Sequence, residues 1–198
     1  MMKLILENWN KYLNEGMSDT IPVEWLTREV LDEVANSYKT QSIPESELGG
    51  IIWDKLHDMG VEEISPIKNF QSDSLLHRWI VLDAVNSAES IAQGARGKAA
   101  LAATRSWLAN PSEENRQVTR SAVINLLHHT QSTGGYTAYC ASMAATVGIL
   151  HGYAIVYAAN GIEAASSSSR QDARDTALLR FRVLAALDEK GILPEPKL

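Results

Sequence analysis

The apolar positions of this chain recur every three to four residues, the spacing of amphipathic helices, and no segment shows a convincing two-residue alternation. In the N-terminal part, Pro22 can open a helix, Ser42 and Glu45 have the spacing of a capping box, and Gly60 stands where a helix commonly ends. Three helices are therefore predicted there, over 5–13, 22–38 and 42–60.

From Ser74 onward alanine replaces large aliphatic residues at many positions, but the helical spacing continues. The clearest start signal is Asn110, Pro111 and Glu113, which combine a side-chain cap, a proline for the first turn and a carboxylate near the free amides. The predicted helices run from Leu75 to Gly94 or Gly97, from there through Trp107, from Pro111 to Leu127, from Gly135 to Ser166, and from Ser169 to Leu187.

The stretch from Tyr139 to Ala159 contains no Asp, Glu, Lys or Arg, and its uncharged neighbours extend from Ser121 to Ile162. It is long enough to cross a bilayer, which takes about 20 apolar residues. However, its tyrosines, threonines and His151 dilute the gain from insertion, and no Lys or Arg cluster flanks it. We therefore interpret it as the central helix of a helical core.

Small residues of this stretch, namely Ala141, Ala145, Gly148 and Gly152, form a ridge on which neighbouring backbones could approach closely. The expected fold is all-α, a multi-helix bundle around this central Ala/Gly-rich helix with a smaller N-terminal lobe. Pro66 and the mixed polarity of 61–73 indicate a connector. The predicted organisation is an N-terminal lobe over 1–70 and an Ala-rich bundle over 71–198, or one continuous domain.

Charge and cysteine content narrow the function classes. A net charge of -6 opposes attraction to phosphate backbones, and no basic run with interleaved aromatics occurs, so nucleic acid is not an expected partner. The single cysteine, Cys140, lies in an apolar stretch and cannot form an internal disulfide. The N-terminal apolar run is too short for a secretory signal, and we expect a cytoplasmic protein.

The histidines offer no paired metal site. His128 and His129 are adjacent and would point about 100° apart on a helix, so they cannot chelate one ion together. His151 is the best lone candidate for an enzyme that uses an inter-helical pocket. Because no companion carboxylate or nucleophile is visible, we interpret it as a hydrogen-bonded structural histidine.

Other charged residues also have a structural interpretation. The sequence "GARGK", Gly94 to Lys98, could present free amides to an anion, but Ala92 and Ala99 replace residues that a phosphate loop needs, so we expect a helix-to-helix turn. Arg78 and Asp83 stand among apolar residues of one helix and could form a buried polar feature, but five residues apart they need not meet. The charges of the last helix predict a solvated face, formed by Asp172, Arg174, Asp175, Arg180 and Arg182. We predict no catalytic, cofactor-binding or metal-binding residues.

Four Ala-rich segments, "LLHRWIVLDA", "AALAATRSWLANPSEENR", "ASMAATVGILHGYAIVYAAN" and "LLRFRVLAALDEKGILPE", together resemble the immunity-five-like family of toxin immunity proteins. This resemblance covers over half of the chain, from about Leu75 to Leu187. It implies a non-enzymatic, all-helical protein that binds and neutralises a partner protein. Ala-rich faces can also pair helices between chains, so homo-oligomer formation stays open.

The N-terminal "LILENWNKYLNEG" is similar to segments found on proteins of tailed marine phages, in which a targeting peptide is cut after a Leu-x-Glu sequence. Leu13, Glu15 and Gly16 match this pattern, which implies cleavage after Glu15. The alternative function is therefore a phage-associated structural or internal virion protein in the bacterial host cytoplasm. An ordinary helix that packs Trp9 and Leu13 on the domain explains the same pattern.

Overall fold

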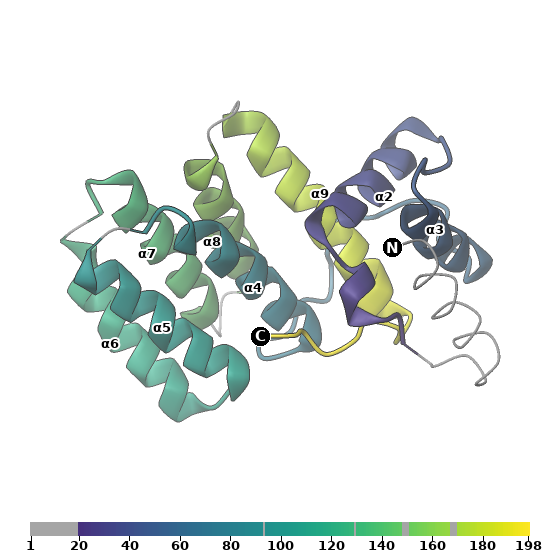
Figure 1. The fold of residues 1–198 in the computed structure, drawn as a ribbon. Helices are drawn as coiled ribbons and strands as arrows, with labels where there is room; N and C mark the ends of the chain where they lie inside the picture. Colours follow the sequence, from purple (N-terminus) through teal and green to yellow (C-terminus); the bar gives the residue numbers. More distant parts are fainter. Residues whose placement is uncertain (1–19, 93, 129, 148–150, 167–169) are drawn as a thin grey trace.

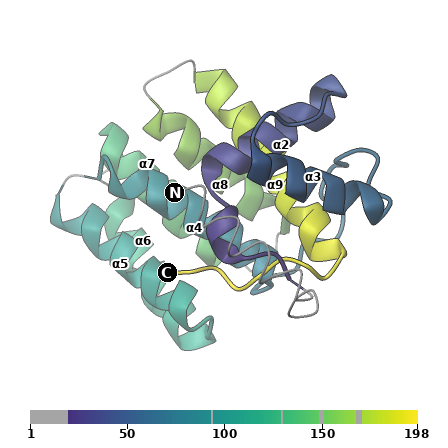
Figure 2. The ribbon, with the colours of Figure 1, turned by 45° about the vertical axis from the view of Figure 1, so that its right-hand side comes forward.

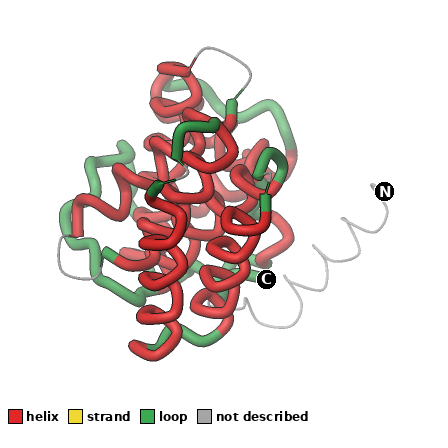
Figure 3. Tube along the Cα trace, turned by 90° about the vertical axis from the view of Figure 1, so that its left-hand side faces the viewer, coloured by secondary structure: helices red, strands yellow, loops and turns green. Residues whose placement is uncertain are grey.

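The computed structural model describes residues 20–92, 94–128, 130–147, 151–166 and 170–198. These residues form helices joined by loops and turns, with no strand among them (Figure 3). The all-α prediction is confirmed. The helices are η1 (Val23–Trp25), α2 (Arg28–Thr40), α3 (Glu47–Asp58), α4 (Leu75–Glu89), α5 (Ala95–Ala109), α6 (Glu113–Leu127), α7 (Thr133–Thr146), α8 (His151–Ala165) and α9 (Arg170–Glu189).

Several helices begin after a hydroxyl side chain that accepts a hydrogen bond from the amide three residues further on, which satisfies one of the free first-turn N–H groups. These N-cap residues are Thr27, Ser46, Ser74, Ser112 and Ser132. Three predicted starts were therefore wrong. Ser42 and Glu45 do not form the expected capping box, because α3 begins after Ser46. Pro22 precedes only the 3-10 helix η1, and α2 starts after Thr27. Asn110 ends α5, while Ser112 caps α6.

The prediction of one continuous central helix was wrong, because the uncharged stretch forms two helices, α7 and α8. The chain leaves the helical conformation at Val147, and α8 begins at His151. The two helices pack against each other more extensively than any other pair in the described part of the chain. A single straight helix would leave much of its apolar surface uncovered, whereas two packed helices bury each other's alanines.

The interface between α7 and α8 depends on small residues. A Cβ atom at Gly161 of α8 would lie 3.3 Å from the Cβ of Cys140 and 3.6 Å from the backbone nitrogen of Ala141, so the backbones approach closely there. Ala141 and Ala145 are fully buried, as the predicted ridge requires. Gly152 is exposed with nothing near it, so its assignment to the ridge was wrong.

The helix α9 joins the N-terminal helix α2 to the later helices, since it packs against α2, α4 and α8 (Figures 1 and 2). After α9 the chain returns along the core. The amide of Ile21 donates to the carbonyl of Ile192 (3.0 Å), and Trp79 Nε1 donates to the carbonyl of Pro194 (2.8 Å). Buried residues from α2 to the C-terminal segment belong to one hydrophobic cluster.

Several predicted features lie outside the described residues. They are the helix over 5–13, the cleavage motif at Glu15, His129, Gly148 and Ser169. α4 ends at Glu89, earlier than the predicted Gly94 or Gly97, and Gly94 immediately precedes α5. The expected helix-to-helix turn at "GARGK" was misplaced, because only Gly94 precedes the helix and Ala95 to Lys98 form the first turn of α5.

Replacing Ala145 with leucine is expected to lower the free energy of unfolding by about 1–3 kcal/mol, because a fully buried alanine position has no room for the larger side chain. Urea denaturation followed by circular dichroism measures this change. The matched control is Gly152→Ala in α8, where the added methyl group meets no atom within 4 Å. Equal stability of the Ala145→Leu variant and the parent would contradict the packing of α7.

Candidate functional site

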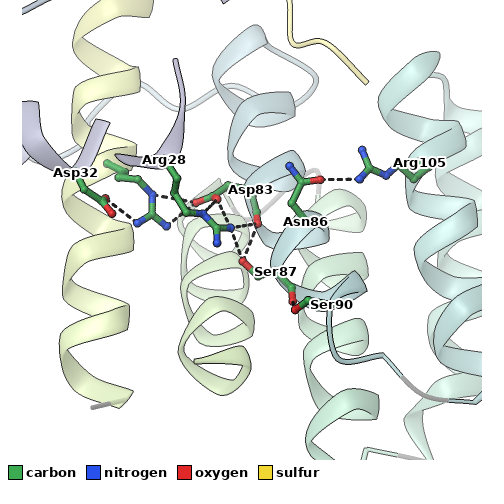
Figure 4. Close-up of polar contacts among 8 residues, drawn as sticks. Arg28, Asp32, Asp83, Asn86, Ser87, Ser90 and Arg105 are labelled. Atoms are coloured by element: carbon green, nitrogen blue, oxygen red, sulfur yellow. Dashed lines mark hydrogen bonds and ion pairs between the residues drawn. The ribbon is translucent and has the colours of Figure 1, made fainter. Parts of the chain in front are cut away.

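The most concentrated group of charges lies where α2, α4 and α9 meet (Figure 4). Arg180 of α9 is only 4% exposed. Its Nη1 donates to Asp32 Oδ1 of α2 at 2.8 Å, and its Nη2 donates to Asp83 Oδ2 of α4 at 2.7 Å. One buried guanidinium therefore binds carboxylates of two other helices.

A second arginine completes this network. Arg28 donates from Nε to Asp83 Oδ1 at 2.6 Å, and from Nη2 to the Asp83 carbonyl at 2.8 Å and to Ser87 Oγ at 2.5 Å. Two guanidinium groups thus face two carboxylates, so the formal charges cancel. We define Arg28, Asp32, Asp83 and Arg180 as the four-charge network.

Burial and ion pairing act in opposite directions on the pKa values of Asp32 and Arg180 in the four-charge network. Burial raises the pKa of Asp32 more than the ion pair with Arg180 lowers it. The carboxylates of Asp83 and Asp32 outweigh the cost of burial for Arg180 and raise its pKa, so this guanidinium stays charged. Since the charged groups face one another, the network joins α2, α4 and α9.

A second buried polar group lies at the N-terminal end of α4. His77 is fully buried; its Nδ1 accepts from the amide of Asp73 (3.0 Å), and its Nε2 lies 2.8 Å from the carbonyl of Ala144. Because Nδ1 is an acceptor, Nε2 carries the proton and donates to this carbonyl. Asp73 also forms an ion pair with the buried Arg116 of α6. This imidazole therefore links the loop before α4 to the C-terminal turn of α7.

The candidate histidines of the sequence do not come together in the described residues. His128 is exposed at the end of α6, and His129 is not among the residues that the structure describes. His151 is the first residue of α8, but its side chain is not described, so the pocket that an enzyme would need there stays a prediction. Among the described residues, no three His, Cys, Asp or Glu side chains form a group that could hold a metal ion.

The charged residues singled out in the sequence differ in their partners and in their burial. Arg78 donates to the Leu108 carbonyl (3.2 Å) and pairs with Glu195, so it does not meet Asp83, as expected. On α9, Asp172 and Asp175 are exposed, in agreement with a solvated face. The prediction was wrong for Arg180, which points into the core because two carboxylates there compensate its charge.

The sequence does contain a signal for this buried arginine. Arg180 stands among Leu178, Leu179 and Phe181, and Asp83 likewise stands in the apolar run of α4. A charge within an apolar run indicates a buried partner, because an unpaired buried charge is costly. However, the partners are 97 positions apart in the chain, and helical spacing alone does not pair them.

The exposed surface of α7 and α8 has a different character. Half-buried and exposed side chains at helical spacing follow one side of both helices, and most of them are uncharged. The carboxylate of Glu163 of α8 borders them and acts on Tyr136. We call this surface the tyrosine face; it consists of Tyr136, Tyr139, Met143, Tyr153, Val156 and Tyr157. The rings of Tyr139 and Tyr157 meet edge to face with centroids 6.2 Å apart, which joins the two helices into one surface.

Two hydroxyl groups of the tyrosine face, those of Tyr136 and Tyr139, ionise only at high pH. A hydrogen bond with Cys140 raises the pKa of Tyr136 to about 12, and burial raises the pKa of Tyr139. Beneath the face, burial raises the pKa of the Cys140 thiol to about 11. Tyr153 is 55% exposed and Val156 is 40% exposed, so large apolar groups are open to solvent here. Tyrosine is enriched where proteins bind proteins.

Among the described residues, no helix is both long and apolar enough to cross a bilayer. Comparisons with known proteins provide no further assignment. No protein-family model matches the chain, and no curated protein and no solved structure matches it.

Proposed function

We propose that this protein is a non-enzymatic, cytoplasmic protein-binding factor whose tyrosine face contacts another protein. The observation that carries the proposal is the gathering of four tyrosines, Met143 and Val156 on one side of α7 and α8. Aromatic side chains contribute much of the free energy in protein interfaces, because they bury a large area at a small cost in conformational entropy.

The arrangement of the polar groups supports a binding role over catalysis. The four-charge network and the group around His77 connect helices through mutual hydrogen bonds. An acid–base catalyst instead needs a titratable group within reach of a substrate. Under the resemblance to immunity proteins, the partner would be a toxin that this chain neutralises.

The proposal is tested by co-purification of the tagged full-length chain and by coexpression with the products of neighbouring genes. The double variant Tyr153→Asp/Val156→Asp is expected to weaken partner binding by about 30-fold or more, because it places charges in the centre of the interface. The control is Ile43→Asp, which adds a charge at an apolar residue that is 70% exposed between α2 and α3.

A stoichiometric partner retained by the parent and by Ile43→Asp, but lost by the double variant, supports the proposal. If that partner is a toxin, cells that express it should grow when the parent or Ile43→Asp is coexpressed, but not when the double variant is. Equal recovery with all three chains would exclude the tyrosine face as the interface. Recovery of no stoichiometric protein from cells that express the neighbouring genes would count against a binding role.

A further inference from the structure

Two cavities adjoin at the exposed side chains of Arg96 and His128, which line both of them. The first has a volume of ≈ 480 Å³ and lies against the first turns of α5 and α7. The second has a volume of ≈ 640 Å³ and lies between α5 and α6. We call the two together the Arg96–His128 groove. None of the described residues that line it belongs to the tyrosine face, which it approaches at the first turn of α7.

The part of the groove between α5 and α6 is apolar. Ala99 of α5 and Ala122 of α6 are short, and Ile124 of α6 is 67% exposed beside them. Small residues beside a projecting isoleucine leave room for apolar side chains of another helix. Recognition of an amphipathic helix in a hydrophobic groove follows this pattern.

The charge of the groove differs from that of the whole chain. The chain has a net charge of -6 with histidine counted as neutral, yet the one charged side chain among the described residues that line the groove is Arg96. At one end, α5 begins after Gly94, which has no side chain to cap the first turn. The positive end of this helix adds to the preference for a negative group.

We propose that the Arg96–His128 groove binds an acidic amphipathic helix of a partner protein. The apolar side chains of this helix contact Ala99, Ala122 and Ile124, and its carboxylates lie beside Arg96 and the first turn of α5. This site is independent of the proposed role of the tyrosine face, so each can be tested while the other stays intact.

The test uses the full-length chain and a fluorescent peptide of about 16 residues, roughly 24 Å long as a helix, with leucines on one face and glutamates on the other. A peptide with lysines in place of the glutamates is the reference ligand. Fluorescence anisotropy at low salt should show binding of the acidic peptide, weakened about fivefold by Arg96→Gln and more by Arg96→Glu. Ile124→Asp should also weaken binding of the acidic peptide, because it places a charge in the apolar part of the groove.

Two control variants separate this site from general charge effects and from the tyrosine face. Lys39→Glu makes the same change in net charge as Arg96→Glu at an exposed position of α2, and it should leave the affinity within about twofold. Tyr153→Asp/Val156→Asp should also retain the acidic peptide. Thermal melting confirms that each variant is folded.

Preferential binding of the acidic peptide, lost with Arg96→Glu and Ile124→Asp but retained in both controls, supports the proposal. Equal affinity for the lysine peptide, no detectable binding of the acidic peptide, or no effect of Arg96→Gln and Arg96→Glu would overturn it. Tighter binding of a uridine oligonucleotide through Arg96 would also overturn it, since the groove would then accommodate a phosphate backbone.

Discussion

Replacing Arg180 with leucine is expected to lower the free energy of unfolding by about 3–5 kcal/mol, the cost of removing one partner from a buried ion pair. The variant would leave Asp32 and Asp83 close together without the guanidinium that now lies 2.8 Å and 2.7 Å from their oxygens. Urea denaturation at neutral pH, followed by circular dichroism, measures the loss.

Two further variants test the physical reason for this loss. Arg182→Leu removes the same charge two positions further along α9, where the side chain is only half-buried, and it should cost less than about 1 kcal/mol. Adding Asp32→Asn to Arg180→Leu should restore part of the stability, because it removes one uncompensated carboxylate. Equal losses for Arg180→Leu and Arg182→Leu would show that the four-charge network does not hold α2, α4 and α9 together.

The second large effect is expected at His77. Leucine has a similar size but makes no hydrogen bonds, so His77→Leu would leave the Asp73 amide and the Ala144 carbonyl without their imidazole partner. Buried groups left unsatisfied cost about 1–3 kcal/mol each, and we expect a total loss of about 2–4 kcal/mol. The midpoint of thermal unfolding at neutral pH should fall accordingly.

A conservative replacement distinguishes hydrogen bonding from packing at this position. Glutamine carries one acceptor and one donor group, so His77→Gln should lose less stability than His77→Leu. If both variants are equally destabilised, the ring contacts of His77 with Phe70 and Trp107 are the dominant contribution. If neither is destabilised, the imidazole does not bridge α4 and α7 as the structure shows.

Helical periodicity was sufficient to predict the fold class and several helix positions. The apolar spacing after Leu75 predicted α4, and Gly60 does follow the end of α3 with a positive φ. The starts of α2 and α6 were misplaced because proline marks a permitted first turn, whereas the hydroxyls of Thr27 and Ser112 make the capping hydrogen bonds.

The separation of α7 from α8 has only a weak signal in the local pattern. No proline or charged residue lies between Thr133 and Ala159, but no alanine occurs from Thr146 to Tyr153, where Gly148, Gly152 and β-branched residues have a lower helix propensity. Tertiary packing decides the outcome, since the Cys140 side of α7 fits the close backbone approach at Gly161. The same limit applies to the four-charge network, in which Arg28 and Asp83 are 55 positions apart.

The buried position of Cys140 provides an intrinsic reporter for local opening of the α7–α8 pair. It is the sole thiol of the chain, and it lies at the point where Gly161 brings the two backbones together. An alkylating reagent reaches only an accessible, deprotonated sulfur. The rate of labelling therefore measures how often these helices separate, with no introduced probe, and a partner seated over the tyrosines would slow it.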